Sequence, residues 1–114
     1  MDISFAHRDL AKCCNDFRLL KRRFGDRQAK KIMQRLEVLR AASCLADIGI
    51  RGMPPYRCHE LFGDRAGELS IDVVHPYRLI FGPDYDPVPR TENGELDWKR
   101  ITAIKIFEVV DTHD

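Results

Sequence analysis

The chain has 114 residues, a length typical of one domain, and its 19 basic side chains nearly balance its 18 acidic ones. A hydrophobic content of 44% allows one core of modest size. No run approaches the roughly 18 apolar residues of a membrane span, and the N-terminus lacks the apolar region of a secretion signal, so we expect a cytoplasmic protein without a membrane partner.

The first half of the chain predicts a strand followed by two helices. Residues 2–6 alternate apolar and polar side chains, as a short strand does. Apolar residues then recur at steps of three and four over residues 7–24 and again over residues 27–43. Gly25 fits the position after the first helix, and Asp26 fits the N-cap of the second. So short a link predicts an antiparallel helical hairpin.

The second half predicts strands over residues 68–74, 77–81 and 100–110, which alternate or are rich in β-branched residues. Residues 82–98 contain three prolines and two glycines and predict an irregular excursion. In the last strand, alternation places Ile104 and Ile106 on one face and Lys105, Phe107 and Val109 on the other.

These elements predict a single α+β domain over residues 1–114. The N-terminal strand and the helical hairpin pack on one face of a mainly antiparallel sheet, and the other face is left for solvent or a ligand.

The basic side chains gather in the first half of the chain. Residues 1–60 carry 13 Lys/Arg and 7 Asp/Glu, whereas residues 61–114 carry 6 and 11. A basic half suits a polyanionic partner. Solvated helix faces explain the same charges without any partner, and the sequence leaves both interpretations open.

The stretch PPYRCHELFGDRAGELSIDV, residues 54–73, does not follow a packing pattern in its first half. It brings Arg57, His59 and Arg65 close together in the sequence and contains two glycines, Gly63 and Gly67. We expect it at the edge of the sheet or on its first central strand, with the glycines in a tight turn.

Charged residues also occur within or beside the later strands. Arg78 lies inside an apolar strand, which is costly unless the charge is paired or faces a groove, and Lys105 raises the same question. Asp111 and His113, two apart near the end of the chain, suit a proton-transfer pair, although a frayed polar tail is the plainer interpretation. We hypothesise that seven residues converge on the open face of the sheet: Arg57, His59, Arg65, Arg78, Lys105, Asp111 and His113.

Such a set suits a phosphodiester better than an acyl or glycosyl group, because it has several cations and few carboxylates. RNA supplies its own nucleophile, the 2′-hydroxyl, so the protein needs only to position it, move protons and neutralise the phosphorane. The sequence predicts no metal and no cofactor, since it has no metal-ligand set, P-loop or dinucleotide fingerprint. The four cysteines have neither disulfide nor zinc spacing and predict free, buried or half-buried thiols.

Several segments resemble the RelE/ParE superfamily of bacterial type II toxins, in its killer-protein (HigB-like) branch. The resemblance covers nearly the whole chain, with a looser fit in the N-terminal half. Its clearest segments are CHELFGDRAGELSID (58–72), PYRLIF (76–81), GELDWKRIT (94–102) and EVVDTHD (108–114).

The resemblance implies a helical hairpin on a twisted antiparallel sheet whose concave face holds the active site. It implies a ribosome-dependent endoribonuclease that cuts mRNA in the A site and acts without a metal. The partners that it implies are the ribosome, mRNA and a cognate antitoxin, expected to be a helix-turn-helix protein. Operator DNA would be contacted only through that antitoxin.

The resemblance also suggests roles for individual residues. His113 would be the general acid or base, with Asp111 orienting it or sharing the role, and His59 would be a second proton-transfer or positioning group. Arg78 and Arg65 would stabilise the phosphate. Arg57 and Lys105 match no family residue, and they are expected to add phosphate contacts as members of the convergent set.

Two positions depart from the family pattern. Phe62 stands where the family has a catalytic lysine, and Thr112 stands where it has a tyrosine of an Asp-Tyr-His ending. These departures favour two alternatives: a binding module with the toxin fold that poisons a partner such as gyrase without cleaving RNA, or an inactive co-regulator that acts with its antitoxin.

Overall fold

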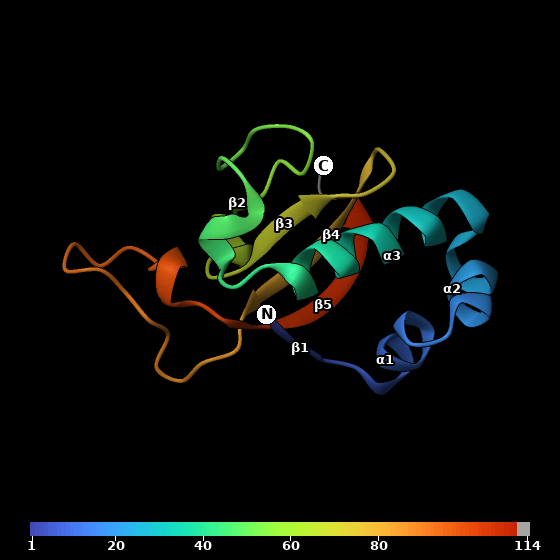
Figure 1. Ribbon diagram of the computed structural model, residues 1–114, viewed down its shortest axis with the longest axis horizontal. Helices are drawn as coiled ribbons and strands as arrows, with labels where there is room; N and C mark the ends of the chain where they lie inside the picture. The colour runs from blue at the N-terminus through green and yellow to red at the C-terminus, as the bar shows by residue number, and fades with distance from the viewer. Residues whose placement is uncertain (112–114) are drawn as a thin grey trace.

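The computed structural model describes residues 1–111, which form an α+β fold of three α-helices and one five-stranded sheet (Figure 1). None of the helices in this range is long and apolar enough to cross a membrane. In chain order the elements are β1 (Asp2–Phe5), α1 (Arg8–Cys14), α2 (Phe17–Phe24), α3 (Asp26–Ala41), β2 (His59–Glu60), β3 (Leu69–Asp72), β4 (Tyr77–Pro83) and β5 (Ala103–Asp111).

The sheet has the strand order β1-β5-β4-β3-β2. β1 runs parallel to β5, and the other neighbouring pairs are antiparallel, which confirms the predicted mainly antiparallel sheet. Because β4 is the central strand, its residues have hydrogen-bonded neighbours on both sides.

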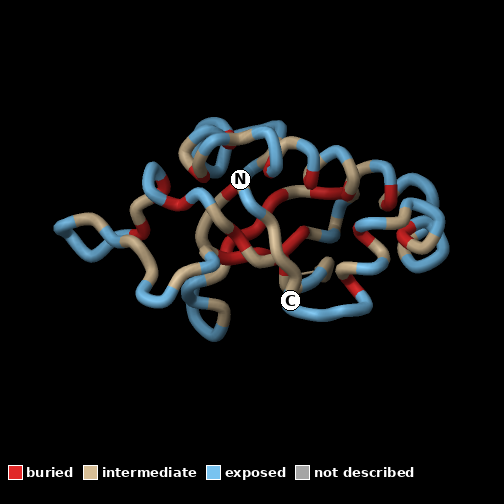
Figure 2. The backbone as a smooth tube through the Cα atoms, turned by 60° about the horizontal axis from the view of Figure 1, so that its bottom comes forward, coloured by how far each residue is buried: buried red, intermediate tan, exposed pale blue. Residues whose placement is uncertain are grey.

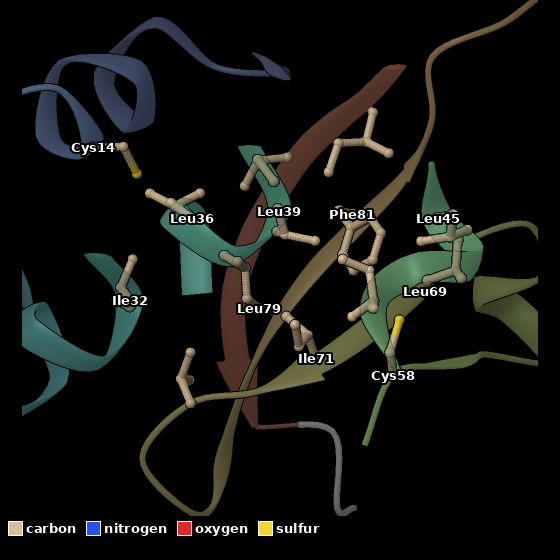
Figure 3. Packing of buried hydrophobic residues seen from close by; sticks show 14 of the residues in the cluster. Cys14, Ile32, Leu36, Leu39, Leu45, Cys58, Leu69, Ile71, Leu79 and Phe81 are labelled. Atoms are coloured by element: carbon tan, nitrogen blue, oxygen red, sulfur yellow. The ribbon is translucent and has the colours of Figure 1, made fainter. Parts of the chain in front are cut away.

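α3 provides the main helical cover of the sheet. Its inward stripe of Ile32, Leu36 and Leu39 is fully buried, as the spacing of three and four predicts. These side chains join one hydrophobic cluster with Leu79 and Phe81 of β4 (Figure 3). α3 lies across one face of the sheet, while α1 and α2 lie beyond its end (Figure 1).

The first predicted helix is two helices, so the prediction of one helix over residues 7–24 is wrong. The break comes at Asp16, whose carboxylate accepts a 3.0 Å hydrogen bond from the backbone N–H of Arg18 and caps α2. An N-cap aspartate in extended conformation starts a new helix, because it satisfies an N–H that a continuous helix would bond internally. The new direction leaves Phe17 exposed.

Gly25 links α2 to α3 with a φ of 84°, a left-handed conformation that favours glycine. Gly25 itself is the N-cap of α3, so the prediction that Asp26 takes this position is wrong. Asp26 is the first residue of the helix, where its carboxylate pairs with Lys30 at 3.0 Å.

A bulge in β5 changes the predicted faces of the last strand. The register shifts between Ile80 and Phe81 of β4, so that Phe81 pairs with Ile106 and Leu79 pairs with Val109. Val109 therefore packs against the core instead of sharing a face with Lys105, as strict alternation predicted. The strand also begins later than predicted, because residues 98–100 form a turn of 3-10 helix.

The polar stretch before β3 contains a strand that the sequence pattern did not predict. β2 has only two residues and pairs with β3 at the edge of the sheet, which confirms the expected edge location. Gly63 and Gly67 have φ angles of 66° and 92° in the tight loop that joins these two strands.

We predict that Leu36→Ala lowers the free energy of unfolding by about 2–5 kcal/mol, because it leaves a cavity where α3 meets the sheet. Glu37→Ala, one residue along on the exposed side, is the matched control and should change it by less than about 0.5 kcal/mol. Chemical denaturation followed by circular dichroism measures both. Equal effects from the two substitutions would contradict the packing of this stripe.

Candidate functional site

The face of the sheet opposite α3 carries two rows of residues. Residues that pair across neighbouring strands point to the same face of the sheet. Leu69, Leu79 and Phe81 lie in the core, so they and their partners mark the face that α3 covers. Their sequence neighbours therefore point the other way. This open face consists of one row with His59, Ser70, Ile80 and Glu108 and a second row with Asp72, Arg78 and Val110.

Two arginines share one carboxylate at the corner where β3 turns into β4. The Arg78 guanidinium hydrogen-bonds to Oδ1 of Asp72, which lies directly opposite it on β3. Arg57 approaches the other oxygen, Oδ2, with its Nε at 3.9 Å. The Arg78 side chain is only 13% exposed, so the ion pair supplies the partner that a charge in an apolar strand requires.

A third arginine anchors the same residue from the helical side. Arg35 of α3 donates a 2.6 Å hydrogen bond from Nε to the backbone carbonyl of Asp72. Its guanidinium also lies 4.9 Å from the centre of the Tyr56 ring. The backbone N–H of Asp72 in turn donates to the carbonyl of Tyr56 at 2.8 Å. Asp72 is therefore held at its main chain as well as at its carboxylate.

A small hollow of about 30 Å³ opens beside this pair and is lined by Arg57, Asp72, His75, Tyr77 and Arg78, among others. Arg57 has a φ of 49°, which is unusual for a residue with a side chain and is found more often at functional sites than elsewhere. A hollow of this size admits a water molecule or a hydroxyl group.

Asp111 reaches the same end of the sheet. It pairs with Tyr77 across β4 and β5, and the preceding Val110 pairs with Arg78. His113 follows two residues later and lies outside the described residues.

His59 lies one strand further out and is held by hydrogen bonds at both ring nitrogens. Nε2 is 3.3 Å from the hydroxyl oxygen of Ser70, a fully buried residue. Nδ1 is 3.2 Å from the backbone carbonyl of Glu60, an arrangement that makes Nδ1 the donor and Nε2 the acceptor. In this geometry the ring is anchored to the sheet, which suits a positioning group better than a proton shuttle.

Arg65 crosses the middle of the open face between two carboxylates. It contacts Glu68 at 3.1 Å and Glu108 of β5 at 3.4 Å. The loop that carries it comes close to the sheet, since a β-carbon on Gly82 would lie 3.4 Å from the carbonyl oxygen of Gly67 and 3.0 Å from the Phe107 ring. This loop and the Phe107 ring therefore cover part of the face.

Lys105 lies near the opposite end of the sheet from Arg78. Its ammonium is 3.8 Å from Asp84, which also accepts a 3.0 Å hydrogen bond from the hydroxyl of Ser4. Lys105 pairs across the strands with Gly82, whereas Arg78 pairs with Val110. Lys105 therefore does not join the corner cluster, which consists of Arg57, Asp72 and Arg78.

The structure spreads the described candidate residues along the sheet and does not gather them at one point. The physical reason is that these residues occupy different rows and both ends of the sheet, and each described cation has a carboxylate near it. Arg57, Arg78 and Asp111 lie at the β3–β4 corner, His59 and Arg65 lie mid-face, and Lys105 lies at the far end.

The charge balance differs among these groups. At the corner, the guanidiniums of Arg57 and Arg78 approach the carboxylate of Asp72, and Arg35 bonds to the backbone carbonyl of the same residue. Arg65, in contrast, stands between two carboxylates, and Lys105 is matched by one. Of the groups formed by the described candidate residues, the corner is therefore the one in which two guanidiniums approach a single carboxylate, an arrangement that suits a phosphate.

Three residues of the corner escaped the sequence reasoning: Asp72, His75 and Tyr77. The sequence pattern presents Asp72 only as a polar residue of its strand and His75 only as part of a His-Pro turn. Asp72 and Tyr77 could have been identified from pairing across the strands, because Asp72 lies opposite Arg78 and Tyr77 lies opposite Asp111. Such pairs can be recognised only when the register of the strands is known, and the sequence pattern does not specify it.

Phe62, which stands at the family's lysine position, is 83% exposed. It precedes the 3-10 turn at Gly63–Arg65, in the loop between β2 and β3. Phe62 is therefore not part of the core.

The basic side chains of the first half lie mainly on the outer surface of the helices, whose outward sides are exposed (Figure 2). Lys21 and Lys30 both pair with Asp26. The exposed cations of α2 and α3 are Arg18, Lys21, Arg22, Arg23, Arg27, Lys30 and Arg40.

The cysteines are free, as predicted, and two of them are buried. Burial raises the pKa of the Cys58 thiol to about 12, although it lies between Arg57 and His59 in the sequence. Burial likewise raises the pKa of Cys14 to about 11. The reactive form of cysteine is the thiolate, so Cys58 is not a nucleophile of this site. Within residues 1–111, no group of three His, Cys, Asp or Glu side chains has the arrangement of a metal site.

We predict that iodoacetamide at pH 8 modifies Cys13 and Cys44 in the folded protein and spares Cys14 and Cys58. A raised pKa keeps the two buried thiols protonated at this pH, and unfolding in denaturant should make all four react. Peptide mass spectrometry of the alkylated chain gives the site of each modification. Modification of Cys58 as fast as Cys44 under native conditions would contradict its burial.

No protein-family model matches the chain, and the comparison with curated proteins gives no match.

Proposed function

We propose that this protein is the toxin of a bacterial type II toxin–antitoxin pair, with a RelE/ParE-like fold of the killer-protein branch. In this proposal it acts in the cytoplasm as a metal-independent endoribonuclease that cuts mRNA in the ribosomal A site. A cognate antitoxin, a helix-turn-helix protein, holds it inactive and carries the pair to operator DNA.

The architecture supports this proposal in outline. A helix covers one face of a mainly antiparallel sheet, and the opposite face presents charged residues from several strands. This is the arrangement that the resemblance in the segments 58–72, 76–81 and 108–114 implies. A fold alone does not define an activity, so the argument for RNA cleavage depends on the corner cluster.

The observation that carries the proposal is the convergence of Arg57 and Arg78 at one corner of the open face, beside the strand that ends in Asp111. Two guanidiniums that approach the same point can bind two oxygens of one phosphate and stabilise the charge of the phosphorane. In this proposal Asp111, at the end of the neighbouring strand, and His113, which lies outside the described residues, would supply proton transfer.

A second candidate function is non-catalytic binding, either as a gyrase-type poison or as an inactive co-regulator with the antitoxin. The observation in its favour is Arg65, which stands between Glu68 and Glu108 and therefore carries no surplus charge for a phosphate. The departures at Phe62 and Thr112 point the same way.

We predict that Arg78→Ala lowers the rate of mRNA cleavage on translating ribosomes on the order of 10²-fold or more, because it removes a donor that stabilises the transition state. Primer extension on a translated mRNA, in a reconstituted system with purified protein, measures the rate. Arg100→Ala is the matched control, since Arg100 also pairs with an aspartate, Asp97, but lies outside the corner.

The melting temperature of each variant shows whether it is folded. A folded Arg78→Ala protein that cuts at the wild-type rate would remove Arg78 from the mechanism. A folded wild-type protein that cuts no translated mRNA would favour the binding function.

We predict that Phe62→Lys leaves the melting temperature unchanged and raises the cleavage rate. The side chain is 83% exposed, so the exchange costs little burial, and the ammonium restores the cation of the family's lysine position, which would offset negative charge on the bound RNA. Phe62→Gln is the control for loss of the aromatic ring without added charge. A fall in cleavage with both variants would instead mean that the ring itself contacts the RNA.

A further inference from the structure

Cleavage of RNA by its own 2′-hydroxyl requires two proton transfers. One group must accept the proton of the 2′-hydroxyl, and another must donate a proton to the leaving 5′-oxygen. For one transfer the sequence suggests His113, which lies outside the described residues. His59 does not suit the other, because both of its ring nitrogens are engaged by Ser70 and by the carbonyl of Glu60.

We propose that Asp72 is the proton acceptor for the 2′-hydroxyl, an inference that rests on the proposed ribonuclease function. Asp72 projects from β3 onto the open face, and its side chain is 23% exposed, so it is partly buried yet accessible. Its carboxylate lies between the two guanidiniums that would bind the phosphate. A nucleophile that attacks a phosphate held there must pass close to this carboxylate.

The hollow beside Asp72 fits the group that it would deprotonate. The hollow measures about 30 Å³ and is lined by the carboxylate, both arginines and His75. It is too small for a nucleotide but admits a hydroxyl group. A 2′-hydroxyl in this hollow would meet the carboxylate, while the adjoining phosphate would remain at the surface with Arg57 and Arg78.

The position of Asp72 is set in advance by contacts other than its carboxylate. Its carbonyl accepts from Arg35 at 2.6 Å, and its N–H donates to Tyr56 at 2.8 Å. These contacts persist if the two guanidiniums turn from the carboxylate to a phosphate. A preorganised base of this kind can act without a further rearrangement of the chain.

The reaction balances as follows. The 2′-hydroxyl proton passes to an Oδ atom of Asp72 as the bond between the 2′-oxygen and phosphorus forms. The bond between phosphorus and the 5′-oxygen breaks, and that oxygen takes a proton from the acid, for which His113 is the candidate. The products are a 2′,3′-cyclic phosphate and a free 5′-hydroxyl. Protonation of Asp72 weakens its hold on Arg57 and Arg78 as negative charge grows on the phosphorane.

The test compares two synthetic mRNAs placed in the ribosomal A site, one with oxygen and one with sulfur at the bridging 5′ position of the scissile bond. Sulfur departs as a thiolate and needs no proton donor, so cleavage of the sulfur RNA depends on the proton acceptor. We expect Asp72→Asn to slow single-turnover cleavage of both RNAs on the order of 10²-fold or more. His113→Ala should slow only the oxygen RNA.

Asp97→Asn is the matched control, because Asp97 also pairs with an arginine and its side chain has the same exposure of 23%, but it lies outside the site. Its cleavage of both RNAs should equal that of the wild type. Binding is measured separately, on ribosomes whose mRNA carries a 2′-O-methyl group at the cleavage position. Asp72→Asn should bind these at least as tightly as the wild type, since the amide removes the negative charge that competes with the phosphate for both arginines.

Asp72→Glu keeps a carboxylate and covers the case in which Asp72→Asn does not fold. It should retain cleavage of both RNAs at a reduced rate.

Two results with Asp72→Asn would overturn the proposal: cleavage of both RNAs at the wild-type rate, or slower cleavage of the oxygen RNA alone. A folded Asp72→Glu protein that cuts neither RNA would also overturn it. So would an Asp111→Asn protein that, in place of Asp72→Asn, loses cleavage of both RNAs. A wild-type protein that binds the ribosomes but cuts neither RNA would overturn the ribonuclease function itself.

Discussion

The packing of α3 on one face of the sheet is the constraint from which the other features follow. Ile32, Leu36 and Leu39 are fully buried against a cluster that includes Leu79 and Phe81. A chain of 114 residues builds one core, so one covered face is what it can fill with apolar side chains. The opposite face must then satisfy its polar and charged groups by other means.

Those means are ion pairs formed across and between strands. Arg78 and Asp72 face each other on β4 and β3, Arg65 spans from Glu68 to Glu108 on β5, and Lys105 pairs with Asp84. Arg78 is the most buried of these charges, with 13% of its side chain exposed, and a buried charge that loses its partner is strongly destabilising. Its pairing with Asp72 is therefore a condition of stability before it is a feature of any reaction.

These ion pairs also bear on the proposed function, because the number of cations for each carboxylate differs between them. Where one cation meets one carboxylate, the site has little attraction for a phosphate. At the β3–β4 corner two guanidiniums, those of Arg57 and Arg78, approach the Asp72 carboxylate, so a phosphate that entered could accept hydrogen bonds from both in place of that carboxylate. The exchange would place a carboxylate beside the bound phosphate, which is the requirement for a base in RNA cleavage.

The sequence by itself determined the α+β class, the buried stripe of α3, the link at Gly25 and the core strands, because these depend on periodicity and on conformational preferences of single residues. It also indicated that Arg78 needs a partner. Only the tertiary structure decided the break at Asp16, the bulge that turns Val109 to the core, the short strand β2 and the pairing of Asp72 with two arginines. Each of these depends on which residues lie opposite one another across strands or on where one helix can turn against its neighbours. Register and docking are set by contacts between residues distant in the chain, which no local pattern of the sequence specifies.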